Sequence, residues 1–119
     1  KMGINNTQTA YSFGQLGSLW LDDTGAATPP TDKVFVAITV VDDCAFTSLV
    51  ADNNVRAGLE YIGTGTSAHD GNLVPNLGES GTGGEVVNST DEFQAGLTIY
   101  GRWTSIQLAS CKIIAYIGD

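Results

Sequence analysis

The chain has 119 residues, of which 13 are acidic and 5 basic, and its net charge at neutral pH is −8. This length predicts one domain with a single core. Nucleic-acid binding requires clustered Lys and Arg, so the composition argues against nucleic-acid partners. No apolar run reaches the roughly 18 residues that span a bilayer, and we therefore expect no membrane association.

The first residues, 1–12, are mainly polar and show no hydrophobic period. This pattern predicts an extended N-terminal arm that becomes ordered when a neighbouring molecule holds it. Tyr11 in this arm and Phe13 directly after it are candidate residues for a subunit or partner contact. Residues 13–119 are predicted to form one β-domain, which begins with a short strand over 13–21 and continues with a proline-containing loop over 22–32.

The strongest strand pattern covers 33–41, where the side chains are almost continuously apolar. Such a run is typical of a central strand that is covered on both faces. A turn and a second extended segment follow over 42–50, and 55–62 fits a strand better than one helical turn. From about 63 to 90 the sequence is rich in Gly, Thr, Ser and Asn, which predicts an insertion that is functional or packed against a partner.

Residues 97–119 show two alternating segments joined by a short polar turn, and we expect them to form a core hairpin. The expected inward positions of its first strand are Leu97, Ile99 and Trp103, and the outward ones are Thr98, Tyr100, Arg102 and Thr104. Helical periodicity is almost absent from the chain. The predicted fold is therefore all-β: a small, mainly antiparallel β-sandwich or barrel, with the sandwich favoured.

The sequence contains no clear catalytic, metal-binding or phosphate-binding motif. His69 is the only histidine, so a catalytic triad would require it, yet its glycine-flanked loop supplies no fixed nucleophile. The pairs 22–23 and 42–43 are acidic but lack the spacing of a calcium loop, and they favour turn formation instead. The glycine-rich segments lack the lysine of a phosphate loop. We expect a protein that is not an enzyme and has no metal site or cofactor, with hydrolysis at His69 as the weakest alternative.

The aromatic residues allow two interpretations. Trp20, Trp103, Tyr100 and Tyr116 could stack on sugars or line a cleft, but the strand positions of both tryptophans favour the core. Arg102 lies on the polar face of its strand beside Tyr100. It suits a pair with a carboxylate at a subunit contact, and the alternative is a solvated arginine without a structural role.

Cys44 and Cys111 are the only cysteines, and each lies at the end of a strong strand. They could meet across a sheet edge and form one disulfide, which would stabilise the fold by about 3 to 5 kcal/mol in the loop-entropy model. Two free thiols are equally compatible with this pattern.

Several segments resemble small structural proteins of marine tailed phages, including cyanophages. The likeness covers most of the chain outside 63–90, and it is carried by Phe13–Ser18, Pro29–Ile38, Asp42–Leu49, Ile99–Ser105 and Lys112–Gly118. In this family Cys44 and Cys111 stand at positions that are more usually small or polar. The resemblance therefore fits a bridge particular to this chain.

The resemblance implies a virion component without catalytic residues. We expect first a decoration or cement protein on the outer surface of the phage head, assembled in the host cytoplasm, where its arm and one sheet face contact the major capsid protein. Such proteins typically associate as homotrimers. The alternative is a tail fibre, appendage or receptor-contact subunit that binds carbohydrate or protein.

Overall fold

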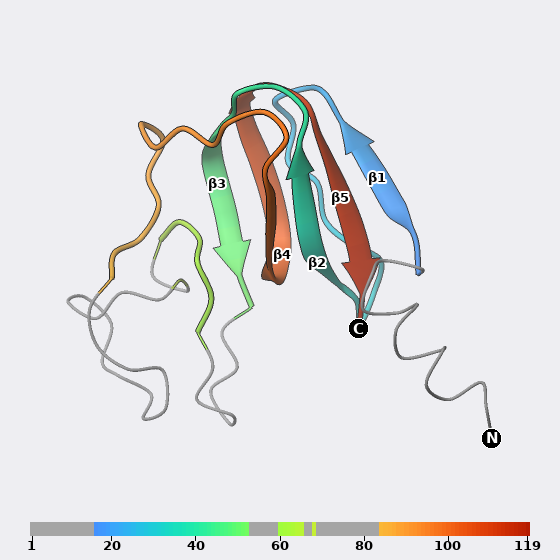
Figure 1. Cartoon of the computed structure of the whole chain (residues 1–119). Coiled ribbons are helices and arrows are strands. Elements are labelled where there is room, and N and C mark those ends of the chain that lie inside the picture. The colour runs from blue at the N-terminus through green and yellow to red at the C-terminus, as the bar shows by residue number, and fades with distance from the viewer. Residues whose placement is uncertain (1–15, 53–59, 66–67, 69–83) are drawn as a thin grey trace.

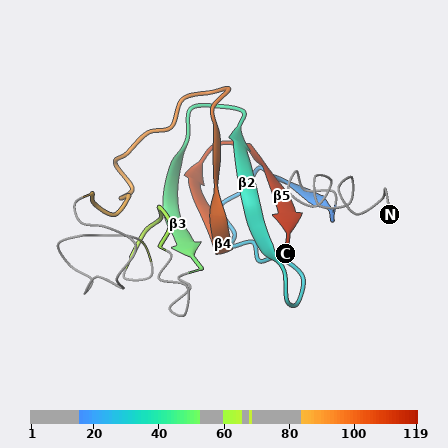
Figure 2. The same ribbon diagram turned by 60° about the horizontal axis from the view of Figure 1, so that its bottom comes forward.

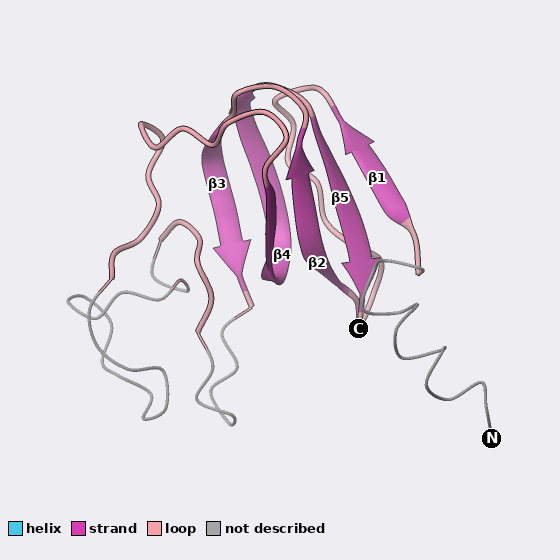
Figure 3. Cartoon of the chain, in the orientation of Figure 1, coloured by secondary structure: helices cyan, strands magenta, loops and turns pink. Residues whose placement is uncertain are grey.

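The computed structural model describes residues 16–52, 60–65, 68 and 84–119 (Figure 1). Its strands are β1 (Ser18–Leu21), β2 (Val34–Val40), β3 (Ala45–Ala51), β4 (Thr98–Ser110) and β5 (Ile113–Gly118). All neighbouring strands are antiparallel, and together they form one sheet in the order β1-β5-β2-β4-β3 (Figure 3). The all-β, mainly antiparallel prediction is confirmed. The predicted arm, 1–12, lies outside the described residues, as do 69–83 of the glycine-rich insertion.

β2 is the central strand of the sheet, as its apolar sequence predicts, and it pairs with β5 on one side and β4 on the other. A register shift between Phe35 and Ala37 changes which side chains point inward. Phe35, Ile38 and Val40 therefore enter the core, whereas Ala37 and Thr39 lie on the opposite face. The prediction that other parts of the chain cover both faces of this strand is only partly right, because Thr39 remains partly exposed.

The predicted C-terminal hairpin is wrong. Only two residues separate β4 from β5, yet the two strands do not pair, because β2 lies between them. The connection crosses the end of β2, where the amide of Val41 donates to the carbonyl of Lys112 at 2.9 Å. Both strands therefore use β2 as their hydrogen-bonding partner.

A bend in β4 explains this topology. Its first part, Thr98–Trp103, pairs with β2, and its second part, from Trp103 onward, pairs with β3. The strand turns sharply between these parts, so the sheet folds over its own core (Figures 1 and 2). The prediction allowed a two-sheet sandwich or a barrel, and the structure has one bent sheet.

Trp103 fills the corner of the bend. Its side chain is fully buried, and its Nε1 donates to the carbonyl oxygen of Ile62 at 2.8 Å. A Cβ atom at Gly101 would lie 2.8 Å from the Trp103 ring, so a glycine is needed where the ring folds back over the strand. The inward position predicted for Trp103 is confirmed.

Side chains from every strand contribute to the core. The bulkiest of the fully buried ones are Trp103, Phe35, Phe46, Ile38, Leu49, Ile106, Leu108 and Ile113. Leu97, which was predicted to point inward, is 44% exposed just before β4. The prediction of a buried Trp20 is also wrong: Leu21 and Leu19 of β1 pack on the core, and the intervening Trp20 points to the other side.

The loop after β1 returns behind the sheet (Figure 1) and closes one side of the core. Ala27 forms an antiparallel bridge with Ile106, with hydrogen bonds of 2.8 and 2.9 Å. On the other side, Thr64 lies along β3, and its amide donates to the carbonyl of Leu49 at 2.7 Å. Of the segment 55–62, which favoured a strand, residues 60–62 are outside any strand and 55–59 lie outside the described residues.

Candidate binding face of the sheet

Four strands present a common surface on the side opposite the core, which we call the outer face. The strand register aligns its side chains in two rows across β1, β5, β2 and β4. One row consists of Ser18, Tyr116, Ala37 and Tyr100, and the other of Trp20, Ile114, Thr39 and Thr98. Residues paired in register point to the same side of a sheet, so these two rows form one continuous patch.

The eight residues of the two rows include no Asp, Glu, Lys, Arg or His, although the protein is strongly acidic. The acidic residues follow the strands in loops: Asp22 and Asp23 come after β1, and Asp42 and Asp43 after β2. Since protein–protein and ligand contacts are typically poor in charge at their centre and rich in aromatic groups, this face has the composition of a contact surface.

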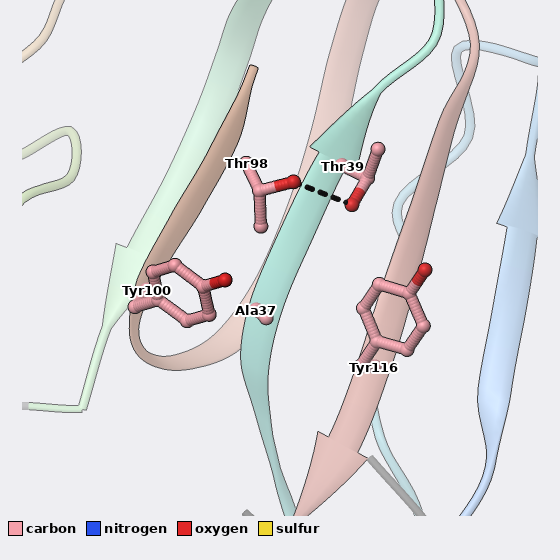
Figure 4. Close-up of a pocket in the computed structure, with 5 residues that line it drawn as sticks. All are labelled: Ala37, Thr39, Thr98, Tyr100 and Tyr116. Carbon is pink, nitrogen blue, oxygen red and sulfur yellow. Dashed lines mark hydrogen bonds between the residues drawn. The ribbon is translucent and has the colours of Figure 1, made fainter. Parts of the chain in front are cut away.

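A groove of about 300 Å³ occupies the middle of the outer face. Ala37 forms its floor because its small side chain lies between Tyr100 on β4 and Tyr116 on β5 (Figure 4). At one end, the hydroxyls of Thr39 and Thr98 are hydrogen bonded at 2.9 Å. The groove therefore combines two aromatic rings with hydroxyl groups in a shallow, open depression.

The two largest exposed aromatic side chains of the described residues belong to this face. Tyr100 is 66% exposed and Trp20 is 53% exposed. Exposure of large rings costs hydrophobic free energy that burial against a partner would recover. The outward position predicted for Tyr100 is confirmed, and Trp20 joins it on the same face.

Arg102 has a carboxylate partner within its own chain. Its Nε donates to Oδ2 of Asp52 at 3.1 Å, and its Nη1 donates to the main-chain oxygen of Asp119 at 2.8 Å. Both side chains of the ion pair are about one third exposed. The carboxylate expected from a neighbouring subunit is thus supplied by Asp52, and the other candidate contact residues, Tyr11 and Phe13, lie outside the described residues.

The two cysteines meet and are joined by a disulfide, with their Cα atoms 5.2 Å apart. Cys44 is fully buried and Cys111 partly so. The Cys44 backbone also pairs with Phe93, whose ring contacts Phe46 edge to face at a centroid distance of 5.3 Å. The bridge thus joins the start of β3 to the β4–β5 connection above a packed aromatic pair.

The acidic pairs lie in the loops after β1 and β2, as predicted. Asp23 accepts a local hydrogen bond from the amide of Gly25 at 3.0 Å, whereas Asp43 accepts one from the amide of Ala95, which is distant in the sequence, at 2.9 Å. In the part of the chain that the structure describes, no three His, Cys, Asp or Glu side chains gather into a possible metal site. His69 lies outside these residues. No helix within the described ranges is long and apolar enough to cross a membrane.

Sequence reasoning identified Tyr100 and Tyr116 as possible ligand contacts but missed the groove between them. The groove does have one signal in the sequence. Ala37 and Thr39 are two residues apart on β2, so both small side chains lie on the same face of a central strand. The neighbours of β2 could not be deduced from this signal, because they are set by the bend in β4. No family model matches the chain, and no curated protein or solved structure shows significant similarity to it.

Proposed function

We propose that the protein is a structural component of a phage virion, a decoration protein that binds the major capsid protein on the outer surface of the head and stabilises the shell. In this role it catalyses no reaction. Many copies, each with a modest contact, would add up to a large stabilisation of the lattice. The resemblance of the sequence to virion proteins motivates this proposal.

One structural observation supports it: the described strands bury a core of their own. The core includes side chains from all five strands, and the segment joined to the arm is fixed where the amide of Ile117 donates to the carbonyl of Gly17 at 2.8 Å. We assign attachment to the arm, 1–12, with Tyr11 in the arm and Phe13 directly after it as candidate contacts.

The size of the outer face is a reason to assign attachment to the arm rather than to this face. Four strand widths of about 4.8 Å and two side-chain rows of about 6.8 Å correspond to about 260 Å² of sheet surface. A stable protein–protein interface requires about 800 Å² on each partner. The outer face alone is therefore too small to hold the protein on a shell, whereas an extended arm adds contact area. Association into homotrimers would increase the area further.

The test is the number of copies relative to the major capsid protein in purified particles, measured by quantitative mass spectrometry. A decoration protein should be present in a simple ratio to the capsid protein, whereas a count of a few to a few tens would indicate a tail or fibre component. Absence from the particles would contradict the virion role altogether.

The exposure of Trp20 and Tyr100 favours a second candidate, a fibre, appendage or receptor-contact subunit. Such a subunit needs aromatic side chains at its surface for recognition. The same copy count separates this candidate from the first.

A further inference from the structure

We propose that the groove between Tyr100 and Tyr116 is a binding site for a neutral saccharide. This inference goes beyond the decoration role and does not depend on it. The groove is open and shallow, it holds about 300 Å³, and it lies on the outer face.

The charge of the protein limits which charge a ligand of the groove can carry. The net charge is −8, and the two rows contain no Lys or Arg, so the residues of the groove offer an anionic ligand no ion pair. The face also has no carboxylate to pair with a cation. An uncharged ligand is therefore the one that is complementary to the groove.

The hydroxyl groups of the groove argue against a purely apolar ligand. Thr39, Thr98, Tyr100 and Tyr116 each contribute a hydroxyl, and covering them with hydrocarbon would remove their water without replacing its hydrogen bonds. The Thr39–Thr98 hydrogen bond satisfies only part of the capacity of that pair. A polyhydroxylated ligand can donate to and accept from all four groups.

The aromatic rings supply the remaining part of saccharide recognition. The C–H groups of a sugar ring pack against aromatic faces, and tyrosine combines such a face with a polar end. The two rings flank Ala37 on strands separated by β2, so they are about 10 Å apart at their backbones. Ala37 leaves the space between them unfilled (Figure 4), and a short oligosaccharide chain lying across β2 could contact both rings.

A second copy of the chain is a poorer occupant, because two outer faces of about 260 Å² each are well below the area of a stable dimer. The observations therefore favour a small ligand.

The experiment uses the full chain labelled for two-dimensional NMR, titrated separately with maltotetraose, cellotetraose and chitotetraose, and with tetragalacturonate as the charged counterpart. We expect at least one neutral tetrasaccharide to bind with a Kd of about 1 mM or lower. Shift changes should concentrate at Ala37, Thr39, Tyr100 and Tyr116.

Variants then connect the binding to the groove. Tyr100→Ala removes one exposed ring and should weaken binding about tenfold. Tyr100→Phe keeps the ring and should retain most of the affinity. Leu97→Ala is the control, since Leu97 is also exposed but lies outside the two rows. Ala37→Leu should abolish binding by filling the groove, and unchanged spectra outside the outer face verify that each variant is folded.

The proposal is overturned if no neutral tetrasaccharide shifts these signals at about 10 mM, well above the expected Kd. Binding of tetragalacturonate alone, or unchanged affinity in Tyr100→Ala, would also overturn it. Protection of the outer face from hydroxyl-radical labelling in assembled particles would show that a protein covers this face. The copy count tests the decoration role separately, so either proposal can fail without the other.

Discussion

Gly101 occupies the most restricted backbone position near the bend of β4. A Cβ atom there would lie 2.8 and 3.0 Å from two atoms of the Trp103 ring, which is itself fixed in the core. We expect Gly101→Ala to lower the free energy of unfolding by about 1 to 3 kcal/mol, since the ring must move to relieve the overlap.

Urea unfolding followed by tryptophan fluorescence measures this loss. Gly25→Ala is the control, because its added Cβ would meet only the flexible carboxylate of Asp23, at 3.3 Å. Equal stability of the Gly101→Ala variant and the unmodified protein would contradict the role assigned to the glycine.

Substitution of Arg102 shows whether the residue that forms the ion pair with Asp52 also contributes to a contact between subunits. Arg102 and Asp52 are each about one third exposed, so solvent screens their attraction. We expect Arg102→Ala to reduce the free energy of unfolding by less than about 1 kcal/mol. Sedimentation velocity of the same variant should show unchanged association. A lower association state would instead show that Arg102 contributes to an interface in addition to its pair with Asp52.

At the scale of the element, Thr64 forms hydrogen bonds with the free edge of β3, which is the last strand of the sheet. The hydroxyl of Thr64 accepts a hydrogen bond from the amide of Leu49 at 2.8 Å, while the Thr64 amide donates to the Leu49 carbonyl. Thr64→Val keeps the shape of the side chain but leaves the Leu49 amide without this acceptor. We expect a loss of about 1 to 3 kcal/mol in chemical unfolding.

Thr104→Val is the matched control for that measurement, since Thr104 is exposed on β4. Faster hydrogen exchange of the Leu49 amide in Thr64→Val would locate the effect at the edge of β3. Unchanged exchange and unchanged stability would contradict this role of Thr64.

The disulfide connects two elements of the fold. It links the residue before β3 to the connection between β4 and β5, across a sequence separation of 67. In the loop-entropy model, a closed loop of this length stabilises the fold by about 4 kcal/mol. We expect reduction to lower the unfolding midpoint in urea. The Cys111→Ser variant should be less stable than the oxidised protein and insensitive to reductant.

Intact mass after alkylation without reduction establishes the starting state of the cysteines. An oxidised chain should accept no label in the folded or the unfolded protein. Two labels on the unreduced, unfolded chain would show that the thiols are free.

At the scale of the whole molecule, the arm and the sheet domain should be separable. Deletion of 1–12 should leave the unfolding midpoint nearly unchanged, because the five strands bury a core to which each of them contributes side chains. The same deletion should reduce occupancy on capsids if the arm provides attachment. Full occupancy of the truncated protein would reject the arm as the attachment point, and loss of folding would show that the domain depends on it.

The sequence by itself determined the fold class and the central strand. Alternating and continuous apolar runs of Val, Ile and aromatic residues are local signals, and 33–41 carries enough of them to identify β2 without any tertiary information. The turn role of Asp23 followed in the same way, because Asp at the end of a strand favours local hydrogen bonds. The bond from Ala95 to Asp43 is long-range and could not be foreseen from the local sequence.

Only the tertiary structure decided the pairing of the strands and, with it, the candidate site. The bend at Gly101 directs the second half of β4 to β3, and β2 then separates β4 from β5, so the expected hairpin does not form. Tyr100 and Tyr116 become neighbours of Ala37 for the same reason. Strand periodicity specifies which face a side chain occupies but not which strand lies beside it, so the groove follows from long-range packing.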